Sequence, residues 1–266
     1  MLYFTQCFFK IVTGRDFVIS DPAGRESHHV TVCRALTSAF RLELPTQGLT
    51  IHMPPGYGKS TFVSMWVAWT MAHYPDSQYL YISYSHDLAA KHTAFIKQIM
   101  DSRLYRYLFD IELSRESKAK DFFKTSVGGS VRAFGSAGAV TGQDGGLPSL
   151  DRHSGAVILD DAIKPDDAHS DTIRARINRN YDETIRQRLR STRVPMISIA
   201  QRVHEDDLGA FFDSGKDLIE WTKLVLPALD DAGNALNPEL HTRDYLENMR
   251  EKSPYVFASQ YQQDPI

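Results

Sequence analysis

Short apolar runs alternate with longer amphipathic segments along most of the chain. The runs are rich in β-branched and aromatic residues, which is typical of strands, and they cover residues 49–53, 79–84, 131–134, 156–159, 196–200 and 221–226. Helical patterns occupy residues 59–73, 87–100, 206–212 and 244–252, and a longer one begins near Ser170 or Asp171. Because strands alternate with helices, the pattern predicts an α/β fold with a largely parallel sheet that helices cover on both faces.

Composition and charge exclude several classes of protein. The 266 residues are 42% hydrophobic and 24% charged, which is ordinary for a globular protein and excludes a disordered chain. The net charge is −3, so the chain is not coated with positive charge. Cys7 and Cys33 are the only cysteines, too few for a disulfide scaffold or a cysteine-based metal site. No apolar run reaches the roughly 18 residues of a membrane span, so we expect a soluble, cytoplasmic protein.

The strongest chemical signal is a phosphate-binding loop between a predicted strand and a predicted helix. Glycines let backbone N–H groups turn toward phosphate oxygens, and the N-terminus of the following helix favours the same anion. Lys59 is expected to reach the β and γ phosphates, and Ser60 to offer its hydroxyl to Mg²⁺. The usual first glycine of this motif falls at Met53 here. The predicted nucleotide-binding residues are Pro55, Gly56, Tyr57, Gly58, Lys59, Ser60 and Thr61. A glycine-rich turn without a ligand is the alternative.

An acidic pair, Asp160-Asp161, ends the buried run at 156–159. Phosphoryl transfer needs a carboxylate that positions magnesium, and Asp160 stands at the end of a parallel strand, where such a group is expected. Asp161 would then orient and deprotonate the attacking water, although its side chain is shorter than the glutamate that is usual there. An acidic pair that merely caps a strand end is the alternative, and Asp166, Asp167 or Glu183 could supply the base instead.

Gln201 and Arg202 end the run at 196–200, so we expect both at the same sheet edge as Asp160 and Lys59. Gln201 would sense the γ-phosphate and relay its loss, and Arg202 would contact phosphate or form an ion pair with an acid. The arginine-rich helix over residues 170–193 is either a solvated face or a surface for DNA or a neighbouring subunit. A hydrolytic ring needs an arginine from a neighbour, and the candidates are Arg132, Arg152 and the arginines of that helix.

Together these segments resemble the large terminase subunit of tailed bacteriophages, the ATPase that drives DNA into the procapsid. The resemblance is carried, in chain order, by residues 53–60; by 81–85 with 87–89; by Thr141-Gly142 upstream of 158–164; by 201–208; and by 257–265. The resemblance implies a P-loop NTPase of RecA-like fold, with a mostly parallel sheet flanked by helices and a small lid segment. It further implies that Lys59 and Ser60 bind ATP and Mg²⁺ and that Asp160 organises the metal. Asp161 would be the catalytic acid, and Gln201 would lie in the coupling motif.

Two features of the chain differ from the family. Gly56-Tyr57 replaces the usual basic pair of the loop, so a compensating arginine from elsewhere is expected. Residues 1–48 match the family only loosely, and an adenine contact is expected near Gln6 or His28. The predicted parts are therefore an N-terminal segment at 1–48 with adenine-side or lid elements, an ATPase core at 49–230, and a lid or linker at 231–266.

The resulting hypothesis is the ATPase domain of a packaging motor in the host cytoplasm. Its expected partners are double-stranded DNA, the portal protein, the small terminase subunit and further copies in a ring on the portal, with no membrane involved. We expect that the chain ends before a nuclease domain and has no endonuclease activity. A helicase-like remodelling ATPase is one alternative, and a nucleotide-binding assembly module with little turnover is another.

Overall fold

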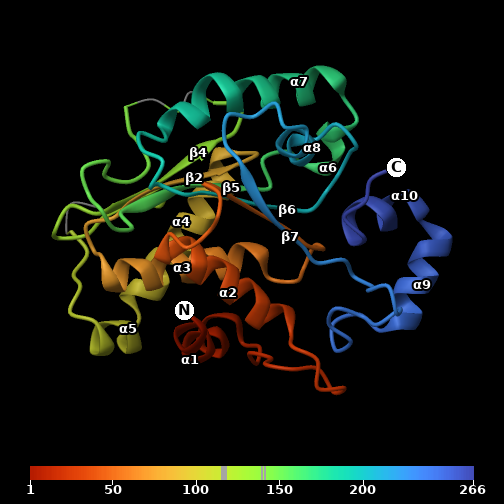
Figure 1. The fold of residues 1–266 in the computed structure, drawn as a ribbon. Coiled ribbons are helices and arrows are strands. Elements are labelled where there is room, and N and C mark those ends of the chain that lie inside the picture. Colours follow the sequence, from red (N-terminus) through yellow and green to blue (C-terminus); the bar gives the residue numbers. More distant parts are fainter. Residues whose placement is uncertain (115–118, 139, 141) are drawn as a thin grey trace.

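A seven-stranded sheet forms the centre of the molecule in the computed structural model, which describes residues 1–114, 119–138, 140 and 142–266 (Figure 1). The strand order is β3-β4-β2-β5-β6-β1-β7. The strands are β1 (Gly48–His52), β2 (Gln78–Ser83), β3 (Phe122–Lys124), β4 (Ser130–Gly135), β5 (Gly155–Asp160), β6 (Met196–Ala200) and β7 (Trp221–Val225). All pairings are parallel except that of β3 with β4, so the predicted α/β class and largely parallel sheet are confirmed.

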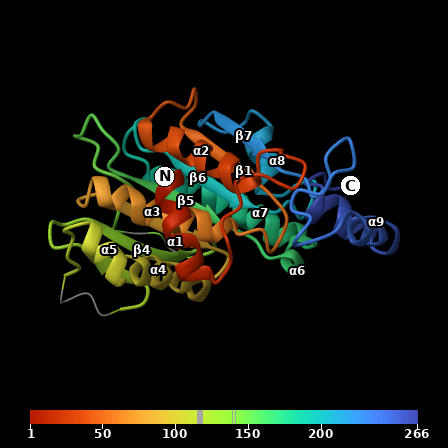
Figure 2. The same cartoon turned by 90° about the horizontal axis from the view of Figure 1, so that it is seen from below.

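Helices cover both faces of this sheet, as Figures 1 and 2 show. One face carries α1 (Leu2–Thr13), α2 (His28–Arg41), α3 (Lys59–His73), α4 (His86–Asp101) and α5 (Arg103–Leu108). The other face carries α6 (Pro165–Ala168), α7 (Asp171–Asn180) and α8 (Leu208–Asp213). After α7 the chain continues as a π-helical turn, η1 (Tyr181–Ile185), and a 3₁₀ turn, η2 (Arg186–Arg188). The arginine-rich helix predicted over 170–193 is therefore shorter and less regular than expected.

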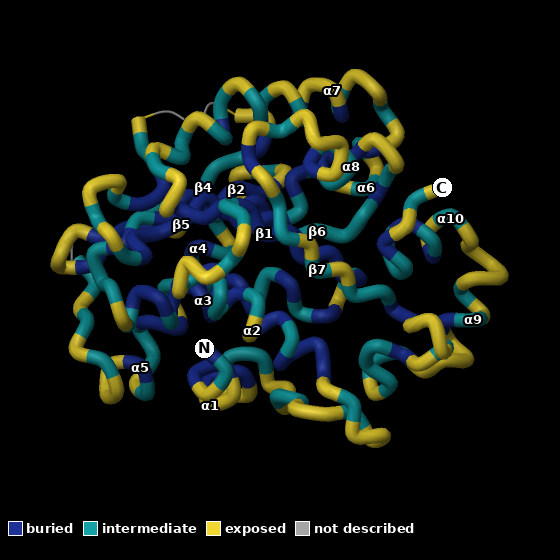
Figure 3. Tube along the Cα trace, viewed as in Figure 1, coloured by how far each residue is buried: buried dark blue, intermediate teal, exposed yellow. Residues whose placement is uncertain are grey.

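Two hydrophobic cores lie on the two faces of the sheet. Successive residues of a strand point to opposite faces. Tyr79 and Tyr81 of β2 accordingly belong to the core under α1–α5, whereas Leu80 and Ile82 belong to the core under α7 and α8. The buried tube in Figure 3 follows the central strands and α3. Since α3 is apolar nearly all round, it is buried on most of its surface, as its sequence predicts.

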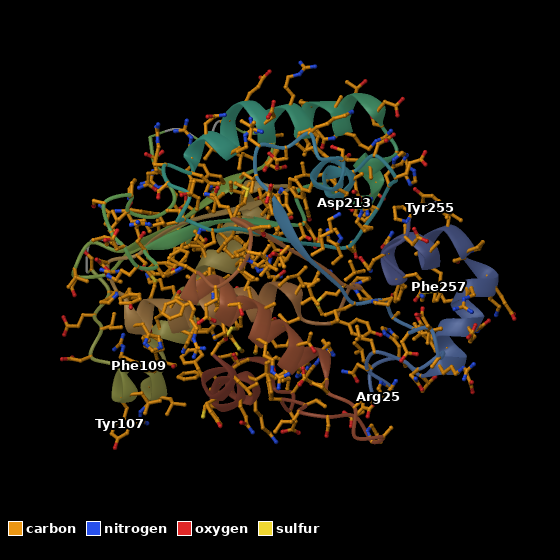
Figure 4. All side chains as sticks on the ribbon, viewed as in Figure 1. Arg25, Tyr107, Phe109, Asp213, Tyr255 and Phe257 are labelled. Atoms are coloured by element: carbon orange, nitrogen blue, oxygen red, sulfur yellow. The ribbon has the colours of Figure 1, made fainter. Side chains whose placement is uncertain are left out.

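The C-terminal segment forms a small cluster of its own at one end of the sheet. It spans residues 228–266 and includes α9 (Arg243–Lys252), α10 (Pro254–Val256) and the π-helical turn η3 (Phe257–Tyr261), and its core includes Leu246 and Phe257. Tyr255, labelled in Figure 4, donates its hydroxyl to the carbonyl of Val203 at 3.1 Å. Arg25, in the loop between α1 and α2, pairs with Asp230 at 3.0 Å. The segment is thus attached to the core and to the N-terminal loop.

Several elements differ from the sequence prediction. Helices α1, α2 and α5 and the antiparallel edge strand β3 were not predicted, although α3 and β6 have the predicted bounds. Thr141 of the terminase-like pattern lies outside the described residues. Among the helices of the described residues, none has both the length and the apolar character required to cross a membrane.

Candidate nucleotide-binding and active site

The phosphate-binding loop connects β1 to α3. Gly56 and Gly58 have φ angles of +85° and +91°, which an L side chain adopts only with strain, so the loop requires glycine at both positions. Lys59 begins α3 and is only 7% exposed. Its Nζ donates to the carbonyls of Met53 and Pro54, both at 3.3 Å, so the side chain folds back over the loop. The free N–H groups of the first turn of α3 form an anion site next to this amine.

Strand order brings the predicted site residues together. β6 lies between β1 and β5, and all three strands run parallel. Their carboxyl ends therefore meet at one edge of the sheet, which is where ligands of open α/β sheets bind. A cavity of about 1020 Å³ opens at this edge. Its lining includes Pro55, Gly56, Gly58, Lys59, Ser60, Thr61, Asp161 and Gln201. The volume is sufficient for a nucleoside triphosphate.

Asp160 is the most buried polar group of the site, with 1% exposure. The Tyr81 hydroxyl donates to its Oδ2 at 2.6 Å. Burial raises the pKa of Asp160, while the Tyr81 and Ser60 hydroxyls and the Lys59 charge oppose the rise. Its Oδ1 is buried and has no hydrogen-bond partner among the described residues. An unpartnered carboxylate oxygen beside a serine hydroxyl is the oxygen-donor set that Mg²⁺ prefers, so the residues fit a magnesium ion.

Asp161 has an unusual backbone conformation at the end of β5. Its φ is +45°, a left-handed value that costs about 1 kcal/mol in a non-glycine residue. The N–H of Asp161 donates to the carbonyl of Ile199 at 2.9 Å, and its carboxylate accepts the N–H of Gln201 at 3.3 Å. Burial raises the pKa of Asp161 to about 6, against the opposing charge of Lys59. A carboxylate with a raised pKa, facing the cavity, is suited to accept a proton from water.

Gln201 and Arg202 are placed differently, although they are neighbours in the chain. Gln201 lines the cavity, and its side-chain oxygen is buried without a partner among the described residues. The guanidinium of Arg202 instead contacts both carboxylate oxygens of Asp207, at 2.9 and 3.0 Å, and does not line the cavity. The phosphate contact predicted for Arg202 is therefore not supported, and the alternative ion pair matches the geometry.

Tyr57 also points away from the predicted phosphate position. It is buried behind the loop, where the ring of His28 packs against it and donates from Nε2 to its carbonyl at 3.2 Å. The Tyr57 hydroxyl hydrogen-bonds to Nδ1 of His241 at 3.1 Å, so the loop is joined to the C-terminal segment. A smaller cavity beside it, of about 400 Å³, is lined by both His28 and Tyr57. Neither Gln6 nor His28 lines the larger cavity, so the adenine contact expected near them is not supported there.

The other candidate acids and arginines lie outside the cavity. Asp167 pairs with Lys164 at 3.7 Å, and Asp166 and Glu183 do not line the cavity either. Arg152 pairs with Asp76 at 2.6 Å, and Arg132 stacks on the Phe122 ring at 4.2 Å. Acids pair with most arginines of the predicted helix, namely Arg174, Arg186, Arg188 and Arg190. Exposed Arg176 and Arg179 have no ion pair in the described part of the chain.

Sequence reasoning missed several residues that line the cavity. Arg15, in the loop after α1, lies beside the glycines of the phosphate-binding loop, and its side chain has no acidic partner in the described residues. Lys91 and His92 of α4 also line the cavity. No local motif marks these residues, because they reach the cavity only through the packing of α1 and α4 around α3.

Comparisons with known proteins add a fold likeness. Neither a protein-family model nor a curated protein sequence matches the chain. Among solved structures, the large terminase ATPase domain of Thermus phage P74-26 superposes with a TM-score of 0.58 at 15% identity, over 94% of this chain and 100% of that one. An arginine-to-alanine mutant of the same domain gives a TM-score of 0.60 at 14% identity, over 91% of this chain and 96% of that one.

The chain has the fold of a large terminase ATPase domain. The large terminase of bacteriophage HK97 also matches, with a TM-score of 0.55 at 15% identity over 100% of this chain. The present chain spans 56% of that longer terminase. The sequence resemblance and the structural likeness thus agree on the fold of a terminase ATPase domain.

Proposed function

We propose that the chain is the ATPase domain of a viral DNA-packaging motor, which hydrolyses ATP to move double-stranded DNA into a procapsid. One observation carries the proposal. In a chain with a terminase ATPase fold, the phosphate-binding loop, Asp161 and Gln201 line a single cavity, and the buried carboxylate of Asp160 ends the strand next to it, as phosphoryl transfer requires.

Each residue has a role that follows from its position. The first turn of α3 and Lys59 hold the phosphates of ATP, and Arg15 adds a positive charge beside the loop, where the usual basic pair is missing. Ser60 and Asp160 hold Mg²⁺, which neutralises charge on the β and γ phosphates when it is bound. Asp161 takes the proton of the attacking water, and the Gln201 side-chain oxygen orients that water. The water oxygen bonds to the γ-phosphorus as the bond to the β-phosphate oxygen breaks, which releases phosphate and ADP.

In this proposal the C-terminal segment responds to phosphate loss. It contacts the phosphate-binding loop through the bond between Tyr57 and His241. It also contacts the end of β6, where the N–H of Arg202 donates to the side-chain oxygen of Gln263 at 3.0 Å. Gln201, which faces the cavity, immediately precedes Arg202. A change at Gln201 on γ-phosphate release would therefore reach the C-terminal segment through the hydrogen bond between the Arg202 N–H and Gln263.

Further partners belong to the same proposal. The domain acts in a homo-oligomeric ring on the portal protein in the host cytoplasm, with the small terminase subunit delivering DNA. A neighbouring subunit supplies a trans-acting arginine, since the only arginine that lines the cavity in the described residues is Arg15. The exposed side chains of Arg176 and Arg179 contact the phosphate backbone of DNA.

DNA-stimulated phosphate release tests the proposal against its alternatives. We expect that double-stranded DNA raises phosphate release from Mg-ATP and that Arg176→Ala with Arg179→Ala reduces this rise. Preferential stimulation by single-stranded DNA, together with duplex unwinding, would favour the helicase-like alternative instead. Nucleotide binding without any release of phosphate, with or without DNA, would favour an assembly module.

A further inference from the structure

The segment from β2 into α4 lies against Asp160, the proposed magnesium ligand. Its residues resemble a terminase motif, but the proposed function gives them no task. Tyr81 is fully buried in β2, and its hydroxyl donates to Oδ2 of Asp160 at 2.6 Å. Ser85 then caps α4 by accepting the N–H of Leu88 at 3.2 Å. The cap fixes where α4 begins, and α4 carries His92 back over the end of β5.

His92 reaches the same carboxylate oxygen from the cavity side. Its Nε2 lies 3.5 Å from Oδ2 of Asp160, and its side chain is 17% exposed. The imidazole stacks on the Tyr81 ring, with centroids 5.4 Å apart and planes 27° apart. Tyr81 and His92 therefore form one packed unit against a single oxygen of Asp160.

This contact has a consequence for the other oxygen. Oδ2 is engaged by a hydroxyl and flanked by an imidazole, whereas Oδ1 has no partner among the described residues. Any turn of the carboxylate plane away from its present orientation would break the Tyr81 hydrogen bond. Outer-shell hydrogen bonds of this kind orient ligating carboxylates, and their loss typically costs 10–100-fold in metal affinity.

We propose that Tyr81 and His92 are positioning residues that hold Asp160 with Oδ1 presented to the magnesium of bound Mg-ATP. The inference rests on the proposed ATPase function, and it assigns a task to two side chains to which that function gives no other role. Tyr81 supplies the hydrogen bond, and His92 keeps the Tyr81 ring and the carboxylate in place.

The test measures magnesium-dependent binding of a fluorescent, non-hydrolysable ATP analogue to the full chain. We expect that Tyr81→Phe raises the Mg²⁺ concentration needed for half-maximal tight binding by about 10–100-fold. Binding of the analogue in excess EDTA stays unchanged, because the phosphate-binding loop is intact. His92→Ala shifts the same magnesium curve in the same direction, and it alters a partly exposed side chain, so it serves as a second variant if Tyr81→Phe fails to fold.

The chain offers a matched control two residues earlier on the same strand. Tyr79 is also fully buried, and its hydroxyl hydrogen-bonds to Thr70 Oγ1 at 2.6 Å and to His153 Nε2 at 2.8 Å, outside the cavity. Tyr79→Phe removes a buried hydroxyl from the same face of β2, and we expect no shift of its magnesium curve.

Two different failures are distinguishable. If wild-type chain shows magnesium-dependent binding but Tyr81→Phe and His92→Ala shift it no more than Tyr79→Phe does, the positioning role is wrong and the proposed ATPase function stands. If wild-type chain binds the analogue equally in Mg²⁺ and in EDTA, or not at all, the proposed function itself is wrong.

Discussion

Acid should destabilise this fold through histidines that are buried in their neutral form, and His153 provides the sharpest case. His153 lies just before β5, with its ring packed against Trp66 and its Nε2 hydrogen-bonded to Tyr79. Burial, helped by the neighbouring Arg152 charge, lowers its pKa from 6.5 to about 3. The unfolded chain therefore binds the proton more tightly, and stability is lost as the pH falls from 6.5 toward 3.

The size of the effect follows from the two pKa values of His153. Each pH unit below 6.5 costs about 1.4 kcal/mol, so the loss from this one residue at pH 5 is about 2 kcal/mol. His28 and His29 are buried as well, with pKa values lowered to about 4 and about 3, and each adds a loss of similar size. Asp161 opposes them, because its raised pKa stabilises the folded chain by about 1.4 kcal/mol between pH 7 and pH 5. The stability lost through the three histidines therefore exceeds the stability gained through Asp161.

Urea unfolding at pH 7.5 and at pH 5.0 measures this difference, with tryptophan fluorescence as the readout. His153→Gln keeps a neutral hydrogen-bonding side chain, so its loss of stability between the two pH values should be smaller than that of wild type by about 2 kcal/mol. His169→Gln, at an exposed position, is the control and should match wild type. An equal loss in His153→Gln and in wild type would refute the argument.

Three further substitutions test the site and the fold. Asp161→Asn should lower phosphate release by about 10²–10⁴-fold with little effect on analogue binding, because the general base is lost. Arg15→Ala should raise the dissociation constant for Mg-ATP, measured by fluorescence titration, by about tenfold through loss of one charge-assisted hydrogen bond. Gly155→Ala should cost at least about 3 kcal/mol in urea unfolding, since its Cβ would lie 1.8 Å from the Gln78 carbonyl oxygen at a φ of +133°.

Each of these substitutions has a matched control. Asp166→Asn changes an acid outside the cavity and should leave phosphate release unchanged. Arg41→Ala changes an exposed arginine at the end of α2 and should leave the dissociation constant unchanged. Gly215→Ala has a φ of +68° and open space around it, so it should cost only about 1 kcal/mol. A control that behaves like its partner contradicts the corresponding prediction.

The sequence predicted most accurately those elements that are apolar on nearly every side and must therefore be buried. The apolar run at 196–200 and the all-round apolar helix at 59–73 have the predicted bounds because each is buried on nearly every side. The turn at Gly56 and Gly58 was predictable as well, since a strand, two glycines and a helix define it.

What the sequence did not show depends on contacts between distant residues. β3 has only three residues and pairs antiparallel at the sheet edge, so its own pattern is too short to mark it. Nothing near His92 indicates that α4 brings it to Asp160, because that contact follows from packing across β2 and β5. Arg202 follows Gln201 directly, yet Asp207 holds it outside the cavity, a choice between partners that spacing leaves open.

Phosphate release from Mg-ATP, measured over a range of protein concentrations with Lys59→Ala as the blank, tests the assigned site most directly. We expect release by wild type, absent in Lys59→Ala, with a specific activity that rises with concentration as subunits assemble and supply the missing arginine. A wild-type rate equal to that of Lys59→Ala at every concentration, with double-stranded DNA present, would contradict ATP hydrolysis at this cavity.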